Sequence, residues 1–174
     1  MLQERDVRRT LSGAALLFIP PQITRDIAIS APRSRRRIVF ASEDGIKLIV
    51  ETSTEEAWLR PILREFARIL ALQTNWDSYG AREVDPGCIR FAIEELLPFA
   101  MRLNTPLPSV VPTNTGGVQL EWHARGIDLE VEVMAPGRLH VFYEDHQTGV
   151  TWEREVLSDL HPLNLPFDRL SGRN

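Results

Sequence analysis

The amino-acid sequence predicts an α+β fold, in which two helices cover one face of an antiparallel meander sheet and an N-terminal hairpin is added. Two observations predict it. Hydrophobic and polar residues alternate over three successive segments between residues 118 and 143, which is typical of strands with one buried face. Ahead of them, hydrophobic residues recur with helical spacing in residues 55–73 and 86–103.

The composition fits one domain of this kind. The chain has 174 residues, of which 43% are hydrophobic and 25% charged, close to the average for globular proteins. A net charge of −4 argues against a general nucleic-acid binder held by positive charge. The single cysteine, Cys88, excludes an internal disulfide and a multi-cysteine zinc site.

The sequence does not show the features of a membrane-spanning segment or of a signal peptide. The longest apolar stretch, Leu11 to Ile19, is too short to cross a bilayer. It also lacks the basic start and the cleavage site of a signal peptide. Together with the lone cysteine, this predicts a cytoplasmic protein that does not enter a membrane.

The sequence divides into three parts. We expect an arm over residues 1–37, one α+β domain over 38–157 and a tail over 158–174 that lies on the surface or on a partner. The arm ends in a basic cluster made of Arg33, Arg35, Arg36 and Arg37. We interpret this cluster as a solvated linker, with a nucleic-acid contact as the alternative. We expect residues 38–51 to form a hairpin, because alternating segments flank Asp44-Gly45.

Proline positions help to place the two helices. Pro61 fits best if the first helix begins near Arg60, since the first helical turn does not need its N–H; otherwise it kinks that turn. Asp85 is expected to cap the second helix, with Pro86 at its first position. Pro98 is expected to bend the last turns of this helix.

A loop of distinctive composition joins the helices: Asn75-Trp76-Asp77-Ser78-Tyr79-Gly80-Ala81. We expect Trp76 to pack into the core and Asp77 to accept backbone N–H groups in an Asx turn. Gly80 would supply a positive φ. The alternative is that Trp76 and Tyr79 stack on a ligand.

Turn residues set the strand register. A two-residue Arg125-Gly126 loop places Trp122 opposite Leu129. A three-residue loop over 135–137, with Gly137 in the left-handed conformation, then places Leu129 opposite Tyr143. Both pairs are apolar and lie on the same face, which supports this register.

The opposite face of the sheet is acidic. The register pairs Glu121 with Glu130, His123 with Asp128, and Glu132 with His140, and it places Phe142 beside Glu130. Directly opposed like charges cost about 0.2–1 kcal/mol. The face is therefore either a solvated surface that prevents edge pairing or a site for a cation or a basic partner. The candidate partner-binding residues are Glu121, Glu130, Glu132, His140 and Phe142.

Two motifs resemble a widespread group of small bacterial proteins with no established activity. They are the loop at 75–81 and the strand segments Gly116-Gly117-Val118-Gln119-Leu120-Glu121-Trp122 and Asp128-Leu129-Glu130-Val131-Glu132-Val133. The resemblance covers about residues 60–145. It implies a bacterial source and a shared core of helices on a meander sheet, and it assigns no catalytic residue.

We find no catalytic or cofactor-binding motif in the sequence: it contains no phosphate-binding loop, no dinucleotide fingerprint and no nucleophile elbow. We therefore expect a non-enzymatic interaction component of a bacterial system, of accessory, adaptor or antitoxin-like type, without a cofactor. Its partner would be another protein, such as a neighbouring gene product, or a second copy in a homodimer. The alternatives are a metal-dependent hydrolase or nuclease using Glu121, Glu130, Glu132 and His140, and nucleic-acid contact through the basic cluster.

Overall fold

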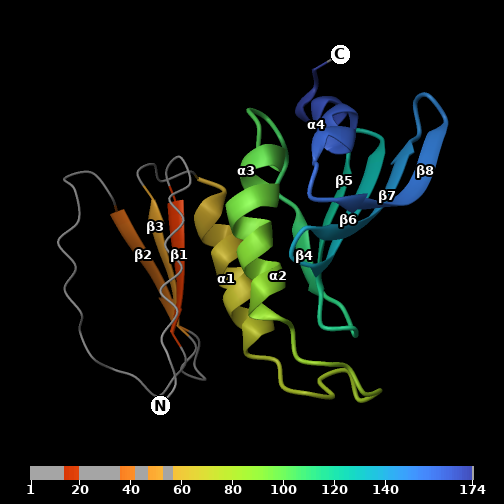
Figure 1. Cartoon of the computed structure of the whole chain (residues 1–174). Helices are drawn as coiled ribbons and strands as arrows, with labels where there is room; N and C mark the ends of the chain where they lie inside the picture. Colours follow the sequence, from red (N-terminus) through yellow and green to blue (C-terminus); the bar gives the residue numbers. More distant parts are fainter. Residues whose placement is uncertain (1–13, 20–35, 42–46, 53–56, 174) are drawn as a thin grey trace.

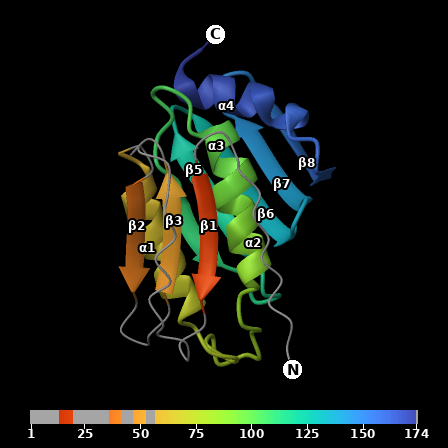
Figure 2. The same cartoon turned by 60° about the vertical axis from the view of Figure 1, so that its left-hand side comes forward.

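The computed structural model describes the backbone of residues 14–19, 36–41, 47–52 and 57–173, and side chains from residue 57 onward together with Ile49 and Val50. It confirms the α+β class. A five-stranded antiparallel sheet, a layer of helices and a three-stranded sheet follow one another across the molecule (Figure 1). Figure 2 shows the three-stranded sheet in front of the helices of residues 59–100, so that these helices lie between the two sheets.

The large sheet is a meander. Its strands are β4 (Ser109–Pro112), β5 (Val118–Ala124), β6 (Ile127–Ala135), β7 (Arg138–Asp145) and β8 (Val150–Leu157). They lie in the order β4-β5-β6-β7-β8, and every neighbouring pair is antiparallel. Each connection is therefore a short turn between adjacent strands, as the alternation of residues predicts.

The predicted register is confirmed. Trp122 pairs with Leu129, and Leu129 pairs with Tyr143. All three side chains are buried, with exposures of 0–1%. The turn at Arg125-Gly126 has positive φ at both residues, 58° and 75°, which matches the right-handed twist of the strands that it joins.

The turn between β6 and β7 differs from the prediction. Ala135 pairs with Arg138, so the turn contains two residues, Pro136 and Gly137, and the register shifts between Val133 and Ala135. This β-bulge takes up the extra residue. The bulge keeps the hydrophobic residues of both strands on one face of the sheet, although the turn has only two residues. Gly137 has the predicted left-handed φ, at 76°.

Helix α1 (Leu59–Leu70) is shorter than expected. Pro61 is its third residue, and the first helical hydrogen bond runs from the Ile62 N–H to the Trp58 carbonyl. The missing N–H of Pro61 therefore removes no helical bond. Leu63 and Phe66, on the inner side of this helix, are completely buried.

The second helix contains one wider turn. Its parts are α2 (Pro86–Phe91), the π-helical η1 (Ala92–Leu96) and α3 (Leu97–Ala100). The Leu97 N–H donates to the Ala92 carbonyl, five residues earlier. Pro98 accounts for this turn, because it has no N–H and its ring would clash with the carbonyl four residues before it. The disturbance expected at Pro98 thus takes the form of a π turn.

The cap of this helix is the one predicted. The Gly87 N–H donates to Asp85 Oδ1 at 2.8 Å, and Pro86 is the first helical residue. We expect Asp85→Ala to lower the free energy of unfolding by about 1 kcal/mol, measured by urea denaturation. Asp85→Asn keeps an acceptor oxygen and serves as the control. Equal losses in the two variants would contradict the capping role.

The segment expected as a C-terminal tail is instead part of the core. It forms η2 (His161–Leu163) and α4 (Asn164–Ser171). Leu163, Phe167 and Leu170 are completely buried. The Phe167 ring meets Trp122 edge-on, with ring centroids 5.2 Å apart. The expectation failed because the segment is too short and too rich in proline to show a helical period.

The small sheet contains β1 (Ala14–Ile19), β2 (Arg36–Ala41) and β3 (Lys47–Thr52), in the order β1-β3-β2. The expected hairpin at 38–51 falls on β2 and β3, which are antiparallel neighbours, and its turn at Asp44-Gly45 lies outside the described residues. β1 pairs with β3, although it belongs to the segment expected as an arm. Val50 of β3 is buried in the same hydrophobic cluster as α1 and the large sheet.

Within the described part of the chain, none of the helices has both the length and the hydropathy needed to pass through a bilayer.

Candidate functional site

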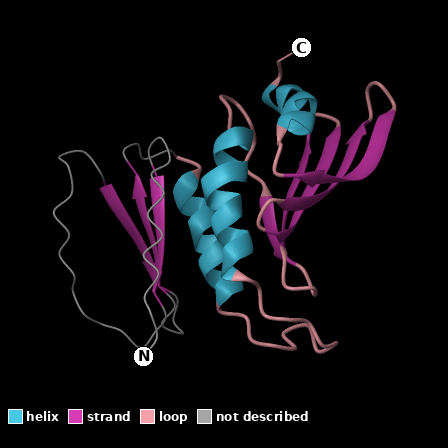
Figure 3. Ribbon diagram, in the orientation of Figure 1, coloured by secondary structure: helices cyan, strands magenta, loops and turns pink. Residues whose placement is uncertain are grey.

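The large sheet has an outer face that the described residues leave uncovered. The helices pack on its other face, and in the described part of the chain none lies over the outer one (Figures 1 and 3). The strand register brings a set of carboxylates to this face: Glu121, Asp128, Glu130, Glu132, Glu144, Glu153 and Glu155. The acidic surface predicted from the alternation of residues therefore extends over β8 as well.

The five predicted partner-binding residues all lie on this outer face and are all partly buried. A neighbouring amide separates the opposed carboxylates of Glu121 and Glu130. Gln119 Nε2 donates to Glu121 Oε1 at 2.8 Å and to Glu130 Oε2 at 3.1 Å. This bridge offsets the like-charge repulsion expected for the pair. Gln119 was not singled out from the sequence, although its alternating position places it on the same face.

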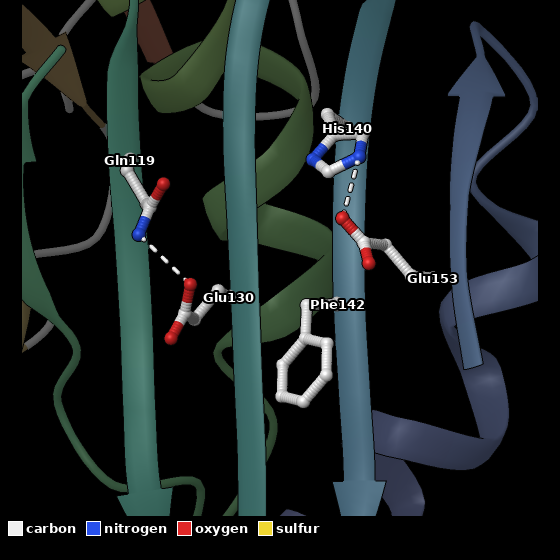
Figure 4. A pocket seen from close by; sticks show the side chains of 5 residues that line it. All are labelled: Gln119, Glu130, His140, Phe142 and Glu153. Carbon is white, nitrogen blue, oxygen red and sulfur yellow. Dashed lines mark hydrogen bonds and ion pairs between the residues drawn. The ribbon is translucent and has the colours of Figure 1, made fainter. Parts of the chain in front are cut away.

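Some of these side chains border a hollow, and the others lie beyond it. Gln119, Glu130, His140, Phe142 and Glu153 line an open hollow of about 270 Å³ (Figure 4). His140 Nε2 lies 3.1 Å from Glu153 Oε1. Glu121 and Glu132 lie outside the hollow, and Glu132 accepts a hydrogen bond from Thr115 Oγ1 at 3.4 Å.

Phe142 lies between two of the acidic residues that line the hollow. Its strand neighbours are Glu130 on β6 and Glu153 on β8. A partly exposed aromatic ring thus lies between two carboxylates on adjacent strands. This arrangement suits a cationic side chain, because the ring face attracts a cation and the carboxylates pair with it.

A second group lies at the end of the face near the turns. His123 Nδ1 is 2.8 Å from Asp128 Oδ1, and His146 Nε2 is 2.7 Å from Asp128 Oδ2. The pKa of each imidazole is raised, chiefly by its hydrogen bond to Asp128. The pKa of Asp128 is lowered, by the bond from His123 first and by that from His146 second. The sequence predicted the pair His123–Asp128 but not His146, which follows β7 in a turn.

The residues proposed for metal-dependent hydrolysis do not come together on one point. Among the described residues, the ligand atoms that converge belong to Asp128, Glu144 and His146, none of which is in the predicted set. Cys88 is completely buried, and its pKa is raised to about 11, mainly by desolvation. Its thiol is therefore a poor nucleophile.

The loop at 75–81 is held by its own polar groups. Asp77 Oδ1 accepts the N–H of Tyr79 at 2.8 Å and that of Ala81 at 3.0 Å, and these bonds lower the Asp77 pKa. Gly80 has the predicted positive φ, at 93°. Contrary to the prediction, Trp76 lies outside the core cluster, and its Nε1 donates to the Arg82 carbonyl at 3.2 Å. Tyr79 is 93% exposed.

The basic cluster lies almost entirely outside the described residues. Arg33 and Arg35 precede β2, and for Arg36 and Arg37 the structure describes only the backbone, within that strand.

Comparisons of this chain with models of protein families, with curated proteins and with solved structures found no match.

Proposed function

We propose that this protein is a non-enzymatic interaction component that binds a basic segment of another protein through the outer face of its large sheet. The observation that carries the proposal is the position of Phe142, between Glu130 and Glu153 in an open hollow. A lysine or arginine of the partner would enter the hollow, stack on the ring and pair with the two carboxylates.

The surroundings of the hollow favour the same kind of partner. The carboxylates of Glu121, Glu132 and Glu144 lie on the same face and extend its negative charge beyond the hollow. Such a surface steers a basic protein toward it and repels nucleic acid, whose phosphates carry the same sign. A basic protein is therefore favoured over DNA or RNA as the occupant of this face.

The biological setting belongs to the same proposal. The motifs at 75–81, 116–122 and 128–133 resemble a group of small bacterial proteins, which supports a bacterial source, and the lone cysteine supports a cytoplasmic setting. In it the protein would act as an accessory, adaptor or antitoxin-like component, and the product of a neighbouring gene is the first partner to test.

The proposal predicts charge-dependent binding. Once a partner has been purified, its affinity can be measured by isothermal titration calorimetry at two salt concentrations. We expect the double variant Glu130→Arg, Glu153→Arg to bind at least tenfold more weakly, because like charges then face each other across the interface. Phe142→Ala should also weaken binding, and added salt should weaken binding of the unmodified protein.

The matched control is Glu95→Arg, which reverses one exposed carboxylate on the π turn, away from the outer face. It should leave the affinity unchanged within about twofold. The control changes the net charge half as much as the double variant does, so a loss of binding free energy about half as large in the control would mean that only net charge matters. If neither the double variant nor Phe142→Ala weakens binding, the hollow is not the binding site. Either result overturns the proposal.

A further inference from the structure

Strand register gathers four metal-ligand side chains at one end of the outer face. His123 on β5 is paired with Asp128 on β6, and Asp128 is paired with Glu144 on β7. These three side chains form a row across the sheet. His146 follows Glu144 by two residues and folds back over this row, so that its ring reaches Asp128 at 2.7 Å. None of these four residues lines the hollow.

Hydrogen bonds already bring the donor atoms of this group together. An ionised Asp128 only accepts, so both imidazoles donate to it, His123 through Nδ1 and His146 through Nε2. His146 Nδ1 lies 3.6 Å from Glu144 Oε1, and His123 Nε2 lies 3.8 Å from Glu121 Oε2. A metal ion bound to both Asp128 and His146 would replace the proton that His146 Nε2 donates to Asp128.

The backbone that carries His146 is fixed in place. Its N–H donates to the Gly126 carbonyl at 2.9 Å, which ties the β7–β8 turn to the β5–β6 turn. Asp145 is only 2% exposed, and it accepts a hydrogen bond from the Gln147 N–H at 2.9 Å. It also forms an ion pair with Arg169 of α4 at 3.0 Å. The imidazole is therefore presented by a rigid turn rather than by a loose loop.

The donor atoms fit a borderline transition metal. Asp128, Glu144 and His146 each offer a ligand atom, and these atoms lie within 4.8 Å of one another. In a tetrahedral zinc site with bonds of about 2.0 Å, ligand atoms stand about 3.3 Å apart. The side chains of Glu144 and His146 are 41% and 52% exposed, so rotation closes the remaining gap. Imidazole with carboxylates suits Zn²⁺ better than Mg²⁺ or Ca²⁺, which prefer oxygen ligands alone.

We propose that Asp128, Glu144 and His146 bind a zinc ion. His123 is a positioning residue that holds the Asp128 carboxylate through its N–H, as partners of metal ligands commonly do. A water molecule would complete the tetrahedron. Zinc bound here ties the β7–β8 turn to β6 and reduces the negative charge at this end of the face. The site goes beyond the proposed partner binding and does not depend on it.

The test is binding of Zn²⁺ alone to the full chain, freed of metal by dialysis against a chelator, at pH 7.5. Isothermal titration calorimetry should give one equivalent per chain. We expect His146→Ala and Asp128→Asn each to weaken binding at least tenfold, and His123→Ala to weaken it by about tenfold, the loss typical of a residue that orients a ligand. The control is His161→Ala, which removes a histidine from η2 and should bind as the unmodified protein does.

A second readout separates loss of the site from loss of the fold. Because the altered side chains lie at the surface, each variant should keep the circular dichroism spectrum of the unmodified protein. In imidazole nitrogen NMR spectra, Zn²⁺ should shift His146 and leave His161 in place. The proposal is overturned if the unmodified protein binds no zinc at micromolar concentration, or if His146→Ala binds as tightly as His161→Ala.

Discussion

Phe167→Ala should lower the free energy of unfolding by about 3–5 kcal/mol, the cost of emptying a fully buried aromatic site. Phe167 is completely buried. Its ring meets Trp122 and Phe99 edge-on, with centroids 5.2 Å and 5.9 Å apart. Each such pair adds about 0.5–1.5 kcal/mol to the burial of the ring. The loss follows from α4 being a component of the core rather than a tail.

Urea denaturation of the variant measures this effect, and Leu165→Ala is its control. Leu165 belongs to the same helix but is 57% exposed, so its loss should change the free energy by no more than about 0.5 kcal/mol. Arg102 also holds α4 in place, through an ion pair with Asp168 and a hydrogen bond that it donates to Asn164 Oδ1. Similar effects of the two alanine substitutions would show that α4 is not packed as described.

Gly116→Ala should cost more than Gly80→Ala, although both glycines have a φ of 93°. At either position an L-residue is strained, by about 1–3 kcal/mol. A Cβ at Gly80 would meet nothing within 4 Å, whereas one at Gly116 would lie 2.9 Å from the Glu83 carbonyl oxygen. Overpacking against backbone adds about 1–3 kcal/mol.

The clash at Gly116 would also disturb the start of the second helix, because the Gly116 carbonyl accepts the Asp85 N–H at 2.8 Å. Thermal unfolding followed by circular dichroism compares the two variants directly, since the strain at equal φ cancels in their difference. A Gly80→Ala variant that is as unstable as Gly116→Ala would mean that strain alone matters and that the contact with Glu83 does not.

The part of the fold that the sequence predicts is the part with local periodicity. Alternation from Val118 to Tyr143 gives both the strands and their register, because a slip of one residue would turn Trp122 and Leu129 toward water. The turn at 136–137 could not be derived in the same way. A β-bulge adds one residue to a strand and so breaks the alternation, and whether the bulge forms depends on the strain that the whole sheet tolerates.

Contacts between residues distant in the chain could not be predicted. The burial of Phe167 depends on the position of Trp122 across the domain, and the segment that carries it is too short to show a period. For the site, alternation places Glu130 and Phe142 on one face but says nothing of side-chain bonds such as those of Gln119. His146 follows a strand, where alternation no longer determines direction, so its approach to Asp128 depends on the geometry of the turn.

The most direct test of the account is photo-crosslinking at the hollow. Phe142→p-benzoylphenylalanine places a reactive ketone between Glu130 and Glu153, and the same substitution at Leu165 places one on α4, away from this face. In the source cells, position 142 should give one defined adduct with a protein segment rich in arginine or lysine, and position 165 should not. An adduct of the same protein at both positions, or none at position 142, would contradict the assignment of the acidic outer face as the binding surface.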